Sequence, residues 1–309
     1  MSDRTALRAT AALTVAVVVV ALLVLVLVDP GRLRSVLGGG PASAPTADSD
    51  DESDADSVAE PVAGLRETPP PPGPPVTTID PAHPFAGSPA ADYPSGIAGL
   101  RLPPAKRVGS FSAKEVGQAL GLARRYFAAS RLDPEVIAGA YPTDVIALLD
   151  PESKDTGLRD ALRQPRTGDG PTQYVTRVDP RQDVLHGSVI KVNGTATVRA
   201  VSPHELVVTV EALVVYAFRR VDGTPEVTRV VLRVRQELST FRGMVTTPGT
   251  VWRGKSSTTW AGVLCTTTED GYLHPAYEGE QGQVAGPSAD PYDARQPPPD
   301  ADCWNATRV

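Results

Sequence analysis

The stretch 206-LVVTVEALVVYAFRRVDGTPEVTRVVLRVRQELSTFR-242 decides the fold of this chain. Apolar residues fall on alternate positions in both of its halves: Leu206, Val208, Val210, Ala212, Val214, Tyr216 and Phe218, then Val230, Leu232, Val234 and Leu238. Such alternation places one face of a strand against a core and leaves the other face more polar. β-branched and aromatic residues dominate, as is typical of a half-buried sheet. The stretch predicts a long β-hairpin.

The turn sets the register of this hairpin. A two-residue turn at Asp222-Gly223 would place apolar Val210 and Ala212 opposite arginines, and a one-residue shift turns every side chain to the wrong face. A five-residue loop, Val221–Pro225, keeps the apolar faces together, and a three-residue loop is the alternative that preserves them. The expected pairs are Val214 with Leu232, Tyr216 with Val230, and Glu211 with Arg235.

Helical patterns come before the hairpin. Ser112-Ala113-Lys114-Glu115 is a capping box, and the apolar spacing after it predicts a helix to about Ser130. Asp133-Pro134 provides an N-cap followed by proline at the first helical position. Thr143–Leu149 and Leu158–Leu162 are two further short helical segments.

Strand patterns dominate the rest of the chain. We expect a strand at Tyr174–Val178 and a last strand at Trp260–Thr267. Asn193-Gly194 predicts a tight turn between Leu185–Val192 and Thr195–Val201. Short helices followed by strands indicate an α+β domain, in which N-terminal helices pack on a curved antiparallel sheet.

The N-terminus carries a candidate membrane anchor. Ala9–Val28 has no charged residue, and as a helix its twenty residues would span roughly 30 Å, the thickness of a hydrocarbon core. A cleaved signal peptide is the alternative, but the candidate cleavage site Ala42-Ser43-Ala44 lies far beyond the apolar run. We expect residues 1–8 inside, a single span at 9–28, and the rest of the chain outside the cell membrane.

Composition divides the remaining chain. Residues 29–110 are rich in proline and acids, with the acidic run Asp48–Asp56 and the proline run Pro69–Pro75, and are expected to be a disordered linker. The patterned part, 111–277, is the expected domain, and 278–309 is a C-terminal tail. From Arg101 onwards the chain has 25 basic and 24 acidic residues, so it lacks the basic field of a duplex nucleic-acid binder.

The chain has two cysteines, Cys265 and Cys303, which we expect to form a disulfide outside the membrane. The alternative is two unpaired thiols. The sequons at Asn193 and Asn305 are interpreted as a turn and a chance match.

No strong catalytic, metal or cofactor motif is present in the sequence. His186, His204, Asp179 and Asp183 could converge as acid–base groups, but ordinary polar edge and turn residues are the simpler interpretation. We therefore expect neither an enzyme nor a bound cofactor or metal.

Four arginines share one face of the hairpin: Arg219, Arg229, Arg233 and Arg235. They could bind an acidic or phosphate-bearing partner, or they could form a solvated sheet face. The same face also carries Leu213, Val215 and Val231, and such a half-apolar surface suggests packing against another protomer or partner.

The expected elements from Phe111 to Thr268 are helices at Ser112–Ser130 and Asp133-Pro134-Glu135-Val136-Ile137, followed by strands with a long final hairpin. This order of elements resembles the nuclear transport factor-like superfamily, also called the cystatin-like roll. With an anchor and linker, it also resembles membrane-anchored assembly proteins of GC-rich Gram-positive bacteria, among them conjugation components and proteins associated with lipid importers. The resemblance implies a cone-like roll that acts as a scaffold.

Three functions remain open at this point. The first is a single-pass membrane protein whose outer domain assembles with proteins of an envelope complex or with further copies of itself. The second is a module that binds a lipid or small molecule in an apolar pocket. The third, an enzyme, is the least supported. A filled core with a flat, half-apolar outer sheet would favour the first, and a pocket lined by two or more titratable groups would favour the third.

Overall fold

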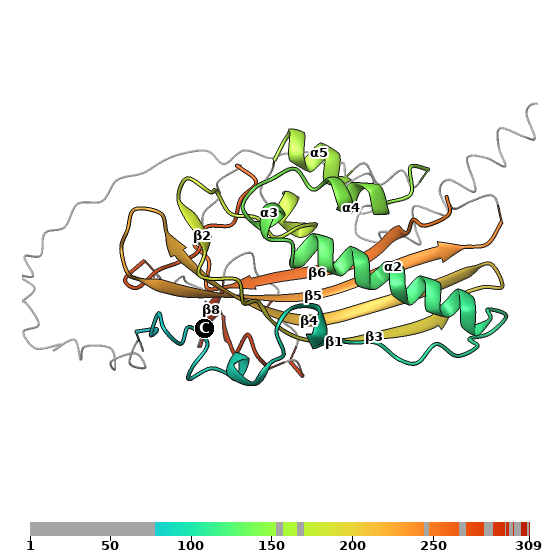
Figure 1. The fold of residues 1–309 in the computed structure, drawn as a ribbon, viewed down its shortest axis with the longest axis horizontal. Helices are drawn as coiled ribbons and strands as arrows, with labels where there is room; N and C mark the ends of the chain where they lie inside the picture. Colours follow the sequence, from blue (N-terminus) through green and yellow to red (C-terminus); the bar gives the residue numbers. More distant parts are fainter. Residues whose placement is uncertain are drawn as a thin grey trace, which may run out of the picture. The chain divides into compact units, whose positions relative to one another are not determined.

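The predicted hairpin lies within the sheet, between β3 (Lys191–Ala200) and β6 (Trp252–Ala261) (Figure 1), and it has the expected register. In a computed structural model of the protein, β4 spans Glu205–Arg220 and β5 spans Val227–Phe241. The structure describes residues 78–152, 157–165, 170–243, 247–265, 270–280, 287–293, 295–296, 299, 304–307 and 309. Val214 faces Leu232, Tyr216 faces Val230, and Glu211 faces Arg235, so the pairing was predicted correctly.

The sheet has six strands and is mixed. Its order is β1-β3-β4-β5-β6, and β2 pairs with β4 beyond the end of β3. The further strands are β1 (Leu100–Arg101), β2 (Asp183–Leu185), β3 (Lys191–Ala200) and β6 (Trp252–Ala261). β1 runs parallel to β3, and the other neighbours are antiparallel. A separate parallel pair is formed by β7 (Ser288–Ala289) and β8 (Asn305–Ala306).

All four predicted helices form: α2 (Ala113–Arg131), α3 (Pro134–Ile137), α4 (Thr143–Leu148) and α5 (Gly157–Arg163). The capping box at Ser112 is complete, because its hydroxyl accepts from the Glu115 N–H and the Glu115 carboxylate accepts in return. The Asp133 carboxylate caps α3 by accepting a hydrogen bond from the Glu135 N–H at 2.9 Å. Short 3₁₀ turns are η2 (Pro89–Asp92), η3 (Gly96–Gly99) and η4 (Pro171–Gln173).

The fold is α+β, but the expected order of helices before the sheet is wrong. β1 precedes α2 and makes the sheet mixed, because Leu100 is buried in the main core and pairs with Gly194 of β3. Residues 78–110, assigned to the linker by composition, are therefore part of the folded unit. Phe85 and Ala90 are also buried, and the Gly96 N–H donates to the Ile190 carbonyl at 2.7 Å.

The turn predicted at Asn193-Gly194 is wrong, because β3 runs straight through both residues. A Cβ at Gly194 would lie 2.7 Å from the Ala212 Cβ and 3.2 Å from the Leu100 Cδ1. The glycine thus serves close packing between neighbouring strands, not a reversal of the chain.

Two other strand predictions also need correction. Tyr174–Val178 is not a strand, since the N–H groups of Thr176 and Val178 donate to the ends of α2 and α3 at Ser130 and Ile137. β6 begins at Trp252 instead of Trp260 and ends at Ala261, where Gly262 adopts a φ of +76°. A Cβ there would lie 2.2 Å from the Arg229 carbonyl oxygen, so glycine is required at this turn.

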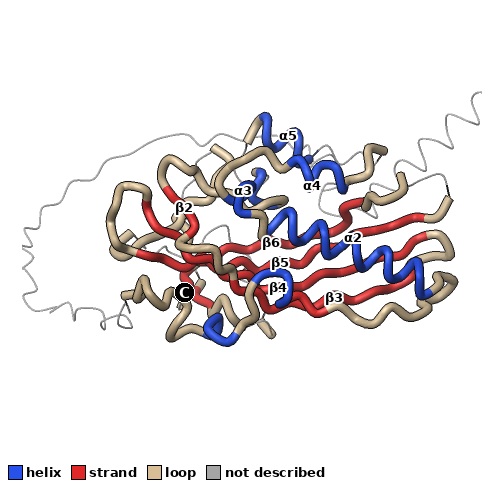
Figure 2. Tube along the Cα trace, viewed as in Figure 1, coloured by secondary structure: helices blue, strands red, loops and turns tan. Residues whose placement is uncertain are grey.

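The main core lies between α2 and one face of the sheet, which the helix crosses in Figure 2. The even-numbered apolar residues of β4 and β5 point into it, as the alternation predicts. Within the described ranges no helix is both long and apolar enough to cross a membrane. Ala9–Val28 lies outside those ranges, so the anchor stays a prediction.

Candidate interaction surface

The outer face of the sheet is the side that points away from α2, formed by the odd-numbered residues of β3, β4 and β5 and by Ser257, Thr259 and Ala261 of β6. One end of it is covered by residues that precede β1 and by Tyr292, which follows β6. There Leu213, Val215, Ala217, Val227, Val231 and Ala261 cluster with Phe85, Ala90 and Tyr292. The apolar half that suggested a partner is thus packed, in part, against the chain itself.

The four predicted arginines do not share one environment. Arg219 and Arg235 are exposed and Arg233 is half-buried, but only 5% of Arg229 is exposed. Burial lowers the pKa of Arg229, an effect that the Tyr292 hydroxyl opposes. Arg229 therefore belongs to the covered half and is not available to a partner in this conformation, which corrects the predicted face.

The uncovered half forms a groove of about 370 Å³ across the sheet. Strand register explains it, because residues of five strands line up in one row: Arg101, Thr195, Glu211, Arg235 and Ser257. An adjacent row contains Asn193, Leu213, Arg233 and Thr259. The groove thus holds two of the predicted arginines together with Arg101, which sequence reasoning had placed in the linker.

The guanidinium groups in the groove are differently paired. Arg235 donates to Glu211 at 2.8 Å and also lies 3.6 Å from Glu237. Arg101 donates to the Asn193 side-chain oxygen at 3.1 Å, and Arg233 donates to the Gln296 carbonyl at 2.7 Å. In the part of the chain that the structure describes, no carboxylate forms an ion pair with Arg101 or Arg233.

Partial burial lowers the pKa of Arg233, while Asp293 and Asp290 nearby raise it. Asp293 is itself paired with Arg295 at 3.1 Å. Arg233 therefore lines the groove with its charge partly offset by Asp290 and Asp293 and with a hydrogen bond to the Gln296 carbonyl.

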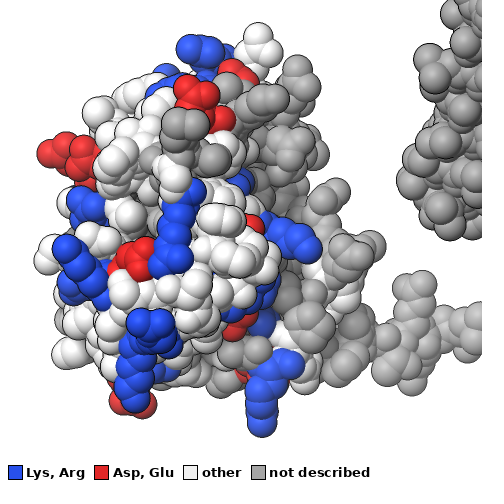
Figure 3. All heavy atoms as spheres, turned by 90° about the vertical axis from the view of Figure 1, so that its right-hand side faces the viewer, with Lys and Arg blue, Asp and Glu red and all other residues white. Residues whose placement is uncertain are grey.

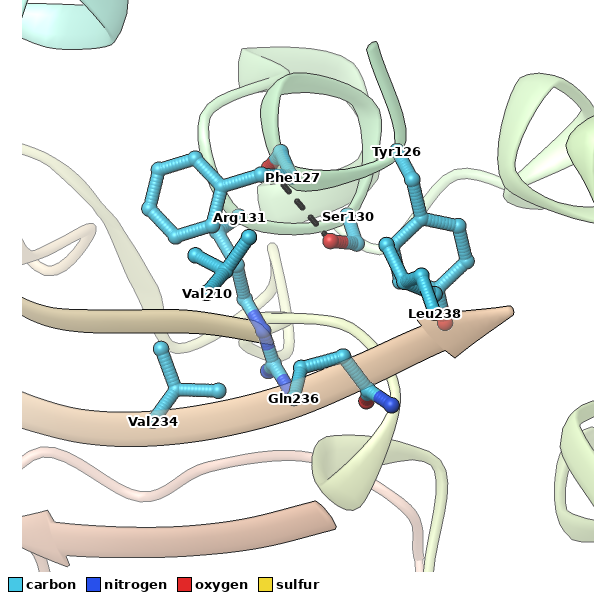
Figure 4. Close-up of a pocket in the computed structure, with 8 residues that line it drawn as sticks. All are labelled: Tyr126, Phe127, Ser130, Arg131, Val210, Val234, Gln236 and Leu238. Atoms are coloured by element: carbon cyan, nitrogen blue, oxygen red, sulfur yellow. Dashed lines mark hydrogen bonds between the residues drawn. The ribbon is translucent and has the colours of Figure 1, made fainter. Parts of the chain in front are cut away.

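Side chains from α2, β4 and β5 converge on a small space beneath the helix (Figure 4). The space lined by Tyr126, Phe127, Ser130, Arg131, Val210, Val234, Gln236 and Leu238 measures about 10 Å³. That volume corresponds to about one water molecule. No substrate-sized cavity lies at this place between α2 and the sheet.

Arg131 crosses this interior and is 3% exposed. It donates to the carbonyls of Thr172 and Gln173 at 3.2 and 2.9 Å, and burial lowers its pKa to about 10. Its own carbonyl accepts from the buried Tyr216 hydroxyl at 3.0 Å, which also lies 2.8 Å from the Thr176 hydroxyl. These contacts satisfy polar groups between helix and sheet, and they give the cluster a structural role.

The four candidate acid–base residues do not converge. Asp179 and Asp183 share a turn beside the C-terminal end of β4, whereas His204 lies just before its N-terminal end. His186 contacts the Pro81 carbonyl at 2.8 Å. Instead, the His274 Nε2 atom lies 3.0 Å from an Asp270 carboxylate oxygen. The pKa of Asp179 is lowered mainly by its hydrogen bond from Arg181, and a positive charge on His274 would lower it further.

The described residues lack a metal cluster, and the end of the molecule seen in Figure 3 has no continuous basic patch. Groups of three or more His, Cys, Asp or Glu that could hold a metal ion are absent from the described residues. Figure 3 shows, at the end of the sheet near the start of α2, basic side chains interspersed with acidic and uncharged ones. Cys265 is disulfide-bonded; Cys303 lies outside the described residues, and pairing of the two stays a prediction.

Two larger open depressions follow the exposed side of α2, with volumes of about 1030 and 900 Å³. They share Ile97, Arg125, Ala128 and Gly249. The larger one has a partly apolar lining that includes Ala129, Leu132, Leu148, Val189 and Ile190. These are open surfaces beside the helix and not enclosed cavities.

Comparison with known proteins finds no match for this chain. No protein-family model matches the chain. Neither a curated protein nor a solved structure matches it. The resemblance to the nuclear transport factor-like superfamily therefore stays a prediction. The outer face of the sheet, with its groove, is the feature of the structure that bears on function.

Proposed function

We propose that the domain is a protein–protein assembly module, held outside the cell membrane by the span at 9–28, and that the uncovered half of the outer face is its docking surface. On this proposal the fold is a scaffold roll of the cystatin-like type. The protein acts by holding a partner or a second copy, and it catalyses no reaction.

One observation carries the proposal: the space around Arg131 between α2 and the sheet is nearly filled, while the outer face is grooved. The space beneath α2 has room for about one water molecule, whereas the groove measures about 370 Å³ and crosses five strands. A domain that encloses a substrate or a lipid needs space inside the fold, usually some 300–1,000 Å³. A domain that docks a protein needs a shaped surface with charged and polar groups at its rim.

The second candidate is a lipid- or small-molecule-binding module. The depression of about 1030 Å³ beside α2 favours it, since its lining includes Leu132, Leu148 and Val189. Its openness to solvent weighs against it, because ligand sites usually bury most of the ligand surface.

Site-specific photo-crosslinking tests the assembly proposal. A photoreactive residue is placed at exposed Ser257 in the groove, and in a matched protein at exposed Gln118 on α2, both in the full chain in its native cells. We expect a discrete adduct of defined mass from Ser257 and none from Gln118. Thr195→Trp, which fills the groove, should remove the adduct.

Equal adducts at both positions, or an adduct that persists in Thr195→Trp, would contradict docking in the groove. Native mass spectrometry of the detergent-solubilised chain separates the two candidates. A copurified apolar ligand on a monomer would move the assignment to the depression beside α2.

A further inference from the structure

The groove has the dimensions of a short extended peptide. Four inter-strand spacings separate β1 from β6, so the groove is about 19 Å wide at roughly 4.8 Å per strand. An extended chain rises about 3.3 Å per residue, so about six residues span it. Arg101 on β1 and Arg233 on β5 are three spacings apart across the strands, about 14 Å, and one row apart along them, so their Cα atoms are separated by about 16 Å, a span that about four residues of an extended chain and two long arginine side chains cover.

Polar donors line this path. Asn193, Thr195, Ser257 and Thr259 carry amide or hydroxyl groups on the outer face. Arg101 and Arg233 contribute guanidinium groups that form no ion pair with the described residues, although Asp290 and Asp293 lie near Arg233. Glu211, on β4 between these two arginines, is paired with Arg235. The groove is thus positive toward both ends and neutral in the middle.

We propose that the groove binds an extended, acidic protein segment with carboxylates four positions apart and an uncharged residue midway. In an extended chain, side chains two and four positions apart point to the same side, so both carboxylates face the sheet. One meets Arg101 and the other meets Arg233. The central Glu211 disfavours a third carboxylate, which separates this partner from a uniformly acidic chain. This inference rests on the proposed function and names the chemistry of its partner.

The test uses fluorescence anisotropy with the full chain in detergent micelles. The probe is a fluorescein-labelled peptide with two aspartates four positions apart and serines between them. At low salt we expect saturable binding, about five- to tenfold weaker for Arg101→Gln/Arg233→Gln, since two partly exposed ion pairs are lost. Raising the salt should weaken the wild-type complex. Arg124→Gln/Arg125→Gln, on the exposed side of α2, is the matched control and should bind as the wild type does.

A second variant distinguishes lost binding from misfolding, because replacing Arg233 also removes its hydrogen bond to the Gln296 carbonyl. Arg101→Gln alone changes an exposed side chain and should weaken binding by about two- to fivefold. A peptide with asparagines in place of both aspartates should not bind. A peptide with aspartate at the middle position as well should bind more weakly than the probe.

Unchanged binding in both groove variants, or equal binding of the asparagine peptide, would overturn the proposal. Binding of a phosphate-bearing polymer but not of the peptide would overturn it too. The crosslink at Ser257 distinguishes failure of the acidic-partner inference from failure of the proposed assembly function. A protein adduct that persists in Arg101→Gln/Arg233→Gln would support assembly and contradict the acidic partner. The absence of any adduct in the wild type would contradict both.

Discussion

Arg242, the residue after β5, forms a two-pronged ion pair with Glu115 in the first turn of α2, with Nε–Oε1 and Nη2–Oε2 distances of 2.7 and 2.8 Å. The same carboxylate accepts from the backbone N–H and the hydroxyl of Ser112 at 2.8 and 2.7 Å. One side chain therefore completes the helix cap and ties the helix to the end of the central hairpin.

Glu115→Gln should make stability less dependent on acid pH. The Arg242 guanidinium, with the Ser112 bonds, lowers the pKa of Glu115 from 4.5 to about 2. A carboxyl whose pKa is lower in the folded state stabilises the fold above its unfolded pKa, and this is lost as the pH falls from about 4.5 toward 2. Urea unfolding at pH 7, 4 and 2.5 should show a wild-type advantage over Glu115→Gln that shrinks with acidification. Glu135→Gln, at an exposed glutamate in α3, is the control, and an advantage that stays constant with pH would contradict the assignment.

Gly194→Ala should destabilise the protein, whereas Gly121→Ala should stabilise it. The new Cβ at position 194 would meet the Ala212 Cβ at 2.7 Å, and overpacking of this kind costs about 1–3 kcal/mol. Gly121 is exposed inside α2 with no atom within 4 Å of its Cβ position, so alanine there should add about 0.5–1 kcal/mol. Chemical denaturation of both variants checks the pair. Equal effects of the two substitutions would show that Gly194 is not needed for close packing.

The same glycine shows where sequence reasoning fails. The hairpin register was predictable because every residue of β4 and β5 has to satisfy the same alternation, so one shift is penalised many times over. Asn193-Gly194 is a local signal, and the packing of Leu100 and Ala212 against it outweighed the turn preference. β1 itself was missed because a two-residue strand carries no periodicity.

The candidate site was predictable only in part. The alternation placed Arg229, Arg233 and Arg235 on one face, and that was correct. It could not show that Tyr292 and Phe85 cover the half containing Arg229, because coverage depends on where distant segments pack. Ser257 was missed because β6 is a polar edge strand that lacks an apolar pattern.

Asp183→Asn should be neutral or stabilising at pH 7, whereas Tyr277→Phe should destabilise. Burial raises the pKa of Asp183, and the Tyr277 hydroxyl donates to it at 2.7 Å. Because the pKa of Asp183 is higher in the folded than in the unfolded protein, its protonated form stabilises the fold at low pH. This stabilisation is lost as the pH rises through the folded-state pKa, so the negative charge of Asp183 is unfavourable at neutral pH. Asparagine keeps an acceptor without the charge.

Tyr277→Phe leaves the buried Asp183 carboxylate without this donor and should cost about 1–3 kcal/mol. Thermal unfolding of both variants at pH 7 tests these expectations. Strong destabilisation by Asp183→Asn would contradict an unfavourable charge at this position.

Cys265→Ser and Cys303→Ser should lower stability by the same amount, and the double variant should be no worse than either. Cys265 is disulfide-bonded, and Cys303 is the other cysteine of the chain. Closing a loop of roughly 40 residues contributes about 3–4 kcal/mol in the chain-entropy model. The comparison is made by denaturation without reductant, and dithiothreitol should bring the wild type to the level of the variants. The intact monomer should be lighter than its reduced form by the mass of two hydrogen atoms. A disulfide-linked dimer, or unequal effects of the two single variants, would show that Cys265 has a different partner.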